Sequence, residues 1–180
     1  MTRIACLILF GSALSLAGCS PSELRQNGNT NVPQPAKPVE LNRYLGKWFE
    51  QGRYEASFQR GCEGVTAEYT LNPDGDVRVV NTCHEGFPDG PARSAEASAK
   101  VAEGSNGAKL KVTFFWPFEA DYWVLDRAND YSWSIVGEPS GRYLWLLTRN
   151  PKLSAGQYEA LVKKAALLGY DTSLLRKTKH

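Results

Sequence analysis

A chain of 180 residues, 42% of them hydrophobic, is long enough to fold into one domain with its own core. Its 21 basic and 19 acidic residues leave a formal net charge of +2, and the sequence has no basic cluster of the kind that binds nucleic acid. We expect Arg176, Lys177 and Lys179, near the C-terminus, to form a solvated tail rather than a nucleic-acid contact.

The N-terminus has the pattern of a secretory signal. Arg3 precedes an apolar run from Ile4 to Leu16, which is shorter than the roughly 20 residues of a membrane-spanning helix. The run ends in Leu16-Ala17-Gly18-Cys19, which resembles the lipobox of bacterial lipoproteins. That resemblance implies cleavage before Cys19, lipidation of its thiol and, because Ser20 follows, export to the outer membrane. The alternative is an ordinary secretory signal that happens to be followed by a cysteine.

Three segments are therefore expected. Residues 1–18 form a lipoprotein signal peptide, residues 19–38 the lipidated Cys19 and a flexible tether, and residues 39–180 one folded domain. The tether is inferred from composition, since residues 20–38 are rich in Asn, Gln, Pro, Ser and Gly and nearly free of large apolar side chains.

The folded domain shows the period of β-strands followed by that of one helix. Residues 65–71 and 77–82 flank the turn Asn72-Pro73-Asp74-Gly75 and predict a hairpin. Further alternating segments include residues 110–116, 122–125, 133–136 and 143–148. A helix is predicted from Ser154, with Gln157 completing a capping box, to a terminator at Gly169. Seven or eight strands predict an antiparallel barrel or a sandwich, and alternation alone does not choose between them.

Three motifs resemble the signatures of the lipocalin family, in the family's order. They are Gly46-Lys47-Trp48, then Asn129-Asp130-Tyr131 with Asn in place of the usual Thr, and then Arg149 before the predicted helix. The resemblance covers about residues 39–175 and is nearest to bacterial lipocalins. It implies an all-β, eight-stranded antiparallel up-and-down barrel with the C-terminal α-helix packed outside. It also implies a structural role for Gly46, Trp48, Asp130, Tyr131 and Arg149, with the Arg149 guanidinium stacked on Trp48 at the closed base.

The resemblance further implies that the barrel interior holds a fatty acid or a lysophospholipid. Strand alternation predicts the lining, although the phase on each strand is uncertain by one position. Arg53 and Arg60, near the open end, could meet a phosphate or carboxylate, the alternative being solvated rim charges. The residues expected to bind ligand are Val65, Ala67, Tyr69, Val79, Val112, Phe114, Trp116, Tyr122, Val124, Trp133, Tyr143 and Trp145.

Cys62 and Cys83 flank the predicted hairpin, so antiparallel pairing brings them together. An oxidising envelope compartment would allow a disulfide, and the alternative is two buried thiols. Their wide separation, without a second cysteine pair nearby, does not suit zinc, and neither a metal nor a cofactor is expected.

The favoured function is non-covalent storage or transport of lipid by a protein anchored to the outer membrane and facing the periplasm, with homodimerisation left open. A second possibility is a structural or interaction lipoprotein whose barrel is filled. A third is a hydrolase or isomerase, but an enzyme is not expected. The two histidines, His84 and His180, give a nucleophile triad few candidates, although a carboxylate pair is not excluded by sequence.

Overall fold

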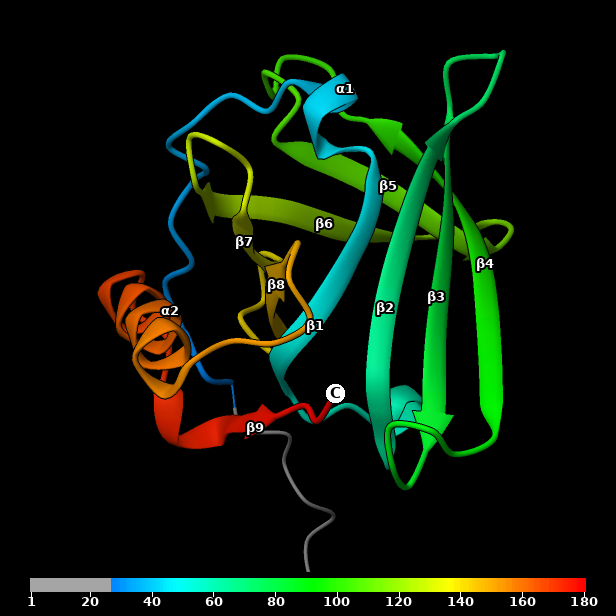
Figure 1. Ribbon diagram of the computed structural model, residues 1–180. Coiled ribbons are helices and arrows are strands. Elements are labelled where there is room, and N and C mark those ends of the chain that lie inside the picture. The colour runs from blue at the N-terminus through cyan, green and yellow to red at the C-terminus, as the bar shows by residue number, and fades with distance from the viewer. Residues whose placement is uncertain (1–26) are drawn as a thin grey trace, which may run out of the picture.

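The computed structural model describes residues 27–180 and contains a closed antiparallel β-barrel (Figure 1). The expected signal peptide and Cys19 lie outside the described residues. Strands follow one another around the barrel in chain order, and β8 pairs with β1 to close it, so the barrel rather than the sandwich is confirmed. The strands are β1 (Gly46–Tyr54), β2 (Cys62–Leu71), β3 (Val77–Glu85), β4 (Ala92–Val101), β5 (Lys109–Phe115), β6 (Phe118–Arg127), β7 (Trp133–Gly137) and β8 (Leu144–Thr148).

The two ends of the barrel differ in what covers them. Helix α1 (Leu41–Tyr44) precedes β1 and covers one end, the closed end. The opposite end, here called the mouth, carries the connections over residues 55–61, 86–91, 116–117 and 138–143. The first of these contains the short 3-10 helix η1 (Ser57–Gln59). Because successive strands are antiparallel, alternate connections lie at the same end, which places these four together.

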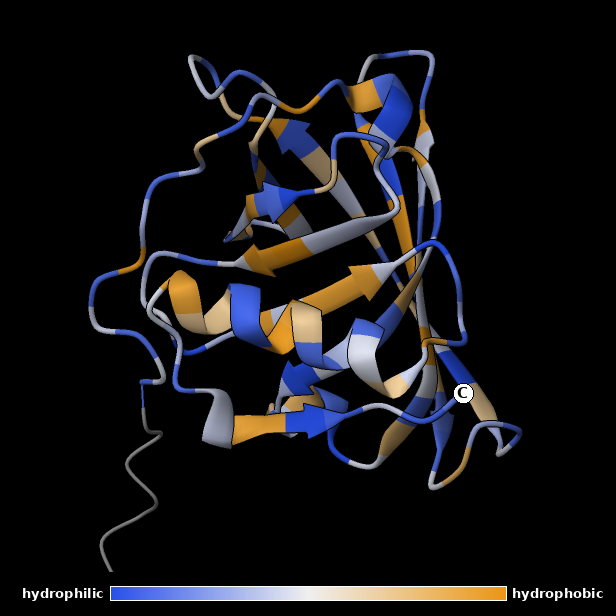
Figure 2. Cartoon of the chain, turned by 60° about the vertical axis from the view of Figure 1, so that its left-hand side comes forward, coloured by the Kyte–Doolittle hydropathy of each residue, from blue (hydrophilic) through white to orange (hydrophobic). Residues whose placement is uncertain are grey.

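Helix α2 (Ala155–Leu167) packs against the outside of the barrel. Ser154 and Gln157 form the predicted capping box, and Gly169 follows the helix at φ +89°, where a side chain would be strained. In Figure 2 this helix lies in front of the barrel wall and carries both apolar and polar residues. Its apolar side, which carries Leu161 and Ala165, packs in one cluster with Tyr170 and with outward-facing residues of the wall, which include Leu125, Ile135, Leu144 and Leu146.

The C-terminal segment completes the wall where β1 and β2 separate. β1 pairs with β2 only from Gly46 to Phe49. Beyond η2 (Thr172–Leu174), strand β9 (Leu175–Lys177) pairs with the far half of β1. The next residues then bridge the gap, since the Thr178 amide donates to Gln51 (3.0 Å) and the Gly64 amide donates to the Lys179 carbonyl (2.8 Å).

The expectation of a solvated C-terminal tail is therefore wrong for this segment. Arg176 and Lys177 belong to β9, and the backbone of Lys179 bonds to β2. The charged composition of the segment does not predict a strand, because a strand added at a sheet edge can be held through its backbone rather than by apolar side chains.

The segment before α1 is also attached to the barrel. The Gly28 amide donates to the Gly141 carbonyl (3.1 Å), and the buried Asn29 side chain donates to the Leu168 carbonyl (2.9 Å). Further along, Lys37 forms an ion pair with Asp126 (2.8 Å). A flexible tether reaching as far as residue 38 is thus contradicted for residues 28–38. The composition shows that this segment cannot build a core of its own, but it can still bond to an existing surface.

Among residues 27–180, no helix is both long enough and apolar enough to cross a bilayer.

Candidate binding site inside the barrel

The closed end is built on Trp48, whose side chain is fully buried. Its indole N–H donates to the Tyr44 carbonyl (2.8 Å), and the Arg149 guanidinium lies over its ring at 3.8 Å. Arg149 also donates to backbone carbonyls of α1 and the start of β1, including that of Leu45 (2.8 Å). Gly46, at φ +88°, lets the chain turn beside Arg149. These contacts join the first strand, the last main strand and α1 into a packed base, as the resemblance implies.

The second motif lies beside this base. Tyr131 adopts a positive φ of 61°, and its ring is flanked by Arg43 and Arg127 at 4.4 and 4.2 Å. Its hydroxyl accepts a hydrogen bond from the Glu40 amide (2.8 Å), while Asp130 accepts bonds from Ser132 that hold its pKa below the usual range. The motif therefore fixes the turn between β6 and β7 to the chain entering α1.

Above Trp48, tyrosine hydroxyls form a polar cluster in the interior. The Tyr122 hydroxyl lies 2.8 Å from those of both Tyr44 and Tyr69, and Tyr44 also contacts Ser134 (3.1 Å). Burial raises the pKa of Tyr44 to about 12 and raises those of Tyr69 and Tyr122 as well. These groups therefore stay neutral at physiological pH. The sequence did not identify Tyr44 or Ser134 as members, although Tyr44 lies only four residues before Trp48.

Most of the residues expected to bind ligand lie in the interior. Tyr69, Val79, Val112 and Val124 are buried there, and Ala67, Tyr122 and Trp145 are partly buried against the same cluster. Val65 packs with Cys62 and Cys83. Tyr143 lies nearer the mouth, stacked on Trp145 at 5.6 Å and beside Phe58 at 5.8 Å.

The interior becomes more accessible toward the mouth. On β4, Ala99 and Ala97 belong to the interior cluster and are buried, whereas Ala95, next on the same face, is exposed. Its partner across the β3–β4 ladder, Asn81, is half-buried, and so is Ala67 on β2. Toward the mouth, these small inward residues therefore keep accessible surface.

Trp133 does not face the interior as expected. It packs outside, in the cluster under α2, with the Lys164 ammonium 4.8 Å from its ring. A register shift between Val124 and Asp126 of β6 accompanies this difference, and on β7 the inward residues are Ser134 and Val136. The predicted phase was therefore wrong by one position on this strand.

Trp116 is not a wall residue either. It lies in the turn between β5 and β6 and is 88% exposed, and Phe114 is 40% exposed. The register of the pair shifts between Val112 and Phe115, and Phe115 faces Phe118 across the last ladder position. Regular alternation therefore ends before Phe114, and the prediction extended it too far.

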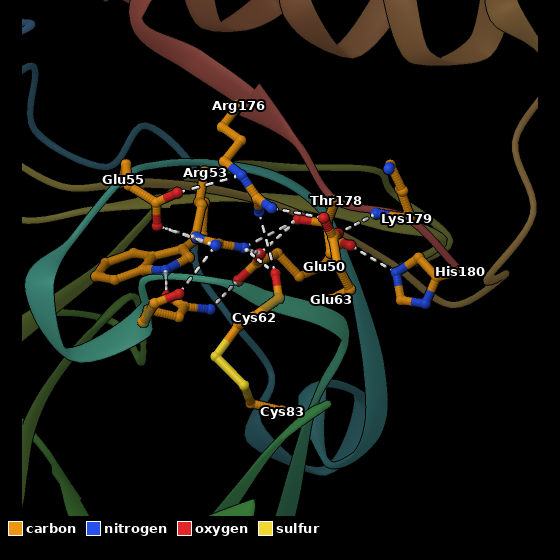
Figure 3. A network of polar contacts seen from close by, with 12 residues as sticks. Glu50, Arg53, Glu55, Cys62, Glu63, Cys83, Arg176, Thr178, Lys179 and His180 are labelled. Atoms are coloured by element: carbon orange, nitrogen blue, oxygen red, sulfur yellow. Dashed lines mark hydrogen bonds and ion pairs between the residues drawn. A yellow bond between two sulfur atoms is a disulfide. The ribbon is translucent and has the colours of Figure 1, made fainter. Parts of the chain in front are cut away.

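A buried ion cluster lies in the wall between β1 and the C-terminal segment (Figure 3). The fully buried Arg53 bonds to Glu50 (2.7 Å) and Glu55 (3.0 Å) and donates to the Gln59 carbonyl (2.9 Å). Burial alone would lower the pKa of Arg53, but the two carboxylates raise it above its usual value. Arg53 is therefore neither a solvated rim charge nor a free partner for a ligand head group.

The C-terminal segment supplies the rest of this cluster. The Thr178 hydroxyl donates to Glu50 (2.6 Å), and Arg176 donates to the Cys62 carbonyl (3.0 Å). The Lys179 amide donates to Glu63 (2.7 Å). Figure 3 shows Arg53 between Glu55 on one side and Glu50 with Thr178 on the other. No local pattern predicts these pairings, because the partners are more than 100 residues apart in the chain.

Cys62 and Cys83 form the expected disulfide between β2 and β3, with their Cα atoms 5.3 Å apart. It joins residues 21 apart near the mouth, for which the chain-entropy model gives a stabilisation of about 3 kcal/mol.

Within residues 27–180, no three His, Cys, Asp or Glu residues are placed to hold a metal ion. An open groove of about 570 Å³ lies outside the barrel, between residues 27–33 and the end of α2, and asparagines make up much of its lining.

Comparison with known proteins gives a consistent result. A family model described as a lipocalin-like domain matches residues 39–180. The outer membrane lipoprotein Blc of Vibrio cholerae is 42% identical over 156 residues, covering 83% of this chain and 89% of that protein. Temperature-induced lipocalin-1 of Arabidopsis thaliana is 39% identical, covering 79% of this chain and 80% of that protein. Among solved structures, insecticyanin of Manduca sexta matches with a TM-score of 0.67 at 17% identity, covering 86% of this chain and 88% of insecticyanin, which supports the fold alone.

Proposed function

Because the chain belongs to the lipocalin family, whose members are binding proteins rather than enzymes, we propose that its barrel binds the acyl chain of a fatty acid or lysophospholipid. The observation that carries this proposal is the accessible, apolar mouth half of the interior. Ala95, Tyr143 and Trp145 leave surface uncovered there. Apolar and aromatic walls with a few placed polar groups suit an acyl chain.

The polar groups of the interior indicate how such a ligand would lie. Arg53 is already bound by Glu50 and Glu55, so a carboxylate or phosphate gains no free cation deep in the barrel. The deep tyrosine cluster, including Tyr69 and Tyr122, is neutral and bonded internally. We therefore place the acyl chain inside and the head group at the mouth, where solvent can hydrate its charge.

We also propose where in the cell this protein lies. Relatives of this chain in Vibrio cholerae and Escherichia coli are named outer membrane lipoproteins. Together with the lipobox-like sequence at Cys19, this supports attachment to the outer membrane through a lipid and storage or transport of lipid there, with the domain in the periplasm.

Ligand binding can be tested by tryptophan fluorescence. Titration with lauric, myristic and palmitic acids and their lysophosphatidylcholines should give a saturable change. Each added methylene that becomes buried should tighten binding up to about fourfold, from roughly 0.8 kcal/mol per methylene. Trp145→Phe should lose most of the signal. Trp133→Phe, on the outer wall, should retain it.

A steric variant checks the position of the ligand. Ala95→Phe places a ring on the inward face of β4 and should weaken binding, whereas Ser94→Phe, on the opposite face of the same strand, should not. Absence of any saturable signal, together with failure to displace an apolar dye, would contradict the proposal and favour a filled barrel that acts as an interaction lipoprotein.

A further inference from the structure

Large aromatic side chains are exposed at one end of the barrel. In the turn between β5 and β6, at the right-hand edge of Figure 1, Phe115 and Phe118 are 79% and 76% exposed and flank the exposed Trp116. Phe58 in the first mouth connection and Phe87 in the second are also more than half exposed. These five residues are here called the aromatic rim. The closed end shows smaller exposed apolar residues, Leu71 and Val101.

The described chain begins at the same end. Gly28 is bonded to Gly141, which lies in the mouth connection between β7 and β8. From Cys19 to Asn27 the chain spans at most about 28 Å, even when fully extended. If Cys19 carries the lipid, as the proposed function requires, residue 27 and the adjoining mouth connection stay within that distance of the membrane surface.

We propose that the aromatic rim inserts into the lipid–water interface of the membrane, so that the barrel opens directly onto the lipid phase. Exposed apolar groups that cluster on one part of a protein mark an interaction surface. Trp116 lies in the β5–β6 turn and is exposed. Tryptophan is enriched where proteins meet the membrane interface, because its ring is apolar and its N–H is polar. Docking of this kind shortens the path of an acyl chain from bilayer to barrel.

Charge does not drive this docking. The mouth connections contain Glu55, Asp89 and Glu138 against Arg60 and Arg142, so they present no basic surface to anionic lipid. Attachment through the rim should therefore change little between low and high salt, unlike binding through a polybasic patch. A second copy of the chain fits the aromatic rim less well than a membrane does, because a dimer through the two rims would cover the mouths that ligand must enter.

The test uses the complete lipoprotein reconstituted in phosphatidylcholine vesicles whose acyl chains carry bromine, which quenches nearby tryptophan. Trp116 should be quenched, so Trp116→Phe should lose most of the quenched emission, at low and at high salt. Trp133→Phe, on the outer wall under α2, serves as the matched control and should retain it. Trp145→Phe separates the two proposals, because brominated chains bound inside the barrel would quench Trp145 instead.

A second pair of variants tests the rim without changing a tryptophan. Phe115→Ser with Phe118→Ser should reduce the quenching of Trp116 and shift its emission to longer wavelength. Leu71→Ser with Val101→Ser removes exposed apolar groups from the closed end and should leave both unchanged. Equal quenching in the Trp116→Phe variant and the parent would overturn membrane docking. So would a dimer in sedimentation with Trp116 shielded from water but not quenched.

Discussion

The buried side chain of Trp48 contacts three parts of the chain, namely α1, β1 and the residue that follows β8. Its ring lies under Arg149 and its N–H donates to Tyr44, so α1, β1 and the end of β8 all depend on it. Arg149 in turn bonds to the carbonyls that end α1, which connects the cation–π contact to the backbone. A side chain with these contacts stabilises the fold.

We predict that Trp48→Ala severely destabilises the domain. Removing a large buried aromatic side chain costs about 3–5 kcal/mol, a large share of the roughly 5–15 kcal/mol by which a domain is stable. Urea denaturation followed by circular dichroism measures the change. Trp48→Phe, which keeps an aromatic ring but loses the hydrogen bond to Tyr44, should lie between the parent and Trp48→Ala. An unchanged midpoint for Trp48→Ala would show that the base is not packed on this ring.

At the scale of elements, the barrel wall depends on a strand from the far end of the chain. β1 leaves β2 after Phe49, and β9 with the residues that follow it bonds to both strands across the gap. The side chains in this seam are charged, and Arg53, Glu50 and Glu63 are nearly or fully buried. Buried charges are tolerated only where each has partners, and Thr178 supplies one for Glu50.

Thr178→Val is therefore expected to destabilise the protein by about 1–3 kcal/mol, because it keeps the shape of the side chain but removes a hydrogen bond to a buried carboxylate. Thr178→Ser retains the hydroxyl and should come close to the parent. Thermal unfolding of the two variants, compared at one pH, provides the measurement. Equal melting temperatures for Val and Ser would mean that the hydroxyl does not support the seam.

At the scale of the whole molecule, the features on which the two proposals rest lie toward one end. The mouth, the aromatic rim and the start of the described chain lie there, while α1 and the Trp48 base close the other end. With Cys19 lipidated as proposed, the tether would join the barrel beside its opening and hold that opening near the membrane. This arrangement fits a protein that exchanges lipid with a bilayer more closely than one that presents its outer surface to a distant partner.

The tether itself gives the last prediction. Cys19→Ser removes the thiol that lipidation requires and should release the protein into the soluble periplasmic fraction or leave it uncleaved. Fractionation of cell envelopes followed by mass spectrometry of the N-terminus would measure both outcomes. A processed, lipid-bearing Cys19→Ser protein in the outer membrane would contradict the anchor. Trp116→Phe, with Cys19 intact, should remain in the membrane fraction.

Local patterns in the sequence were sufficient for most of the elements. The turn at residues 72–75, the capping box at Ser154 and Gln157, and the end of α2 all follow from side chains close together in the chain, and the structure contains each of them. The pairing of Cys62 with Cys83 followed from the hairpin between them. The motif residues Trp48 and Arg149 required knowledge of a family, because nothing local shows that they meet.

The sequence by itself determined the succession of strands and helix, since turn chemistry and side-chain period act over a few residues. Only the tertiary structure decided which side chains share the interior. On β7 the inward residues are Ser134 and Val136, which leaves Trp133 outside. On β5 a register shift after Val112 ends the regular alternation, and Trp116 lies in the turn beyond it. The tertiary structure also decided that Arg53 is paired with Glu50 and that Thr178 completes the wall, because those contacts depend on how distant segments of a closed barrel come together.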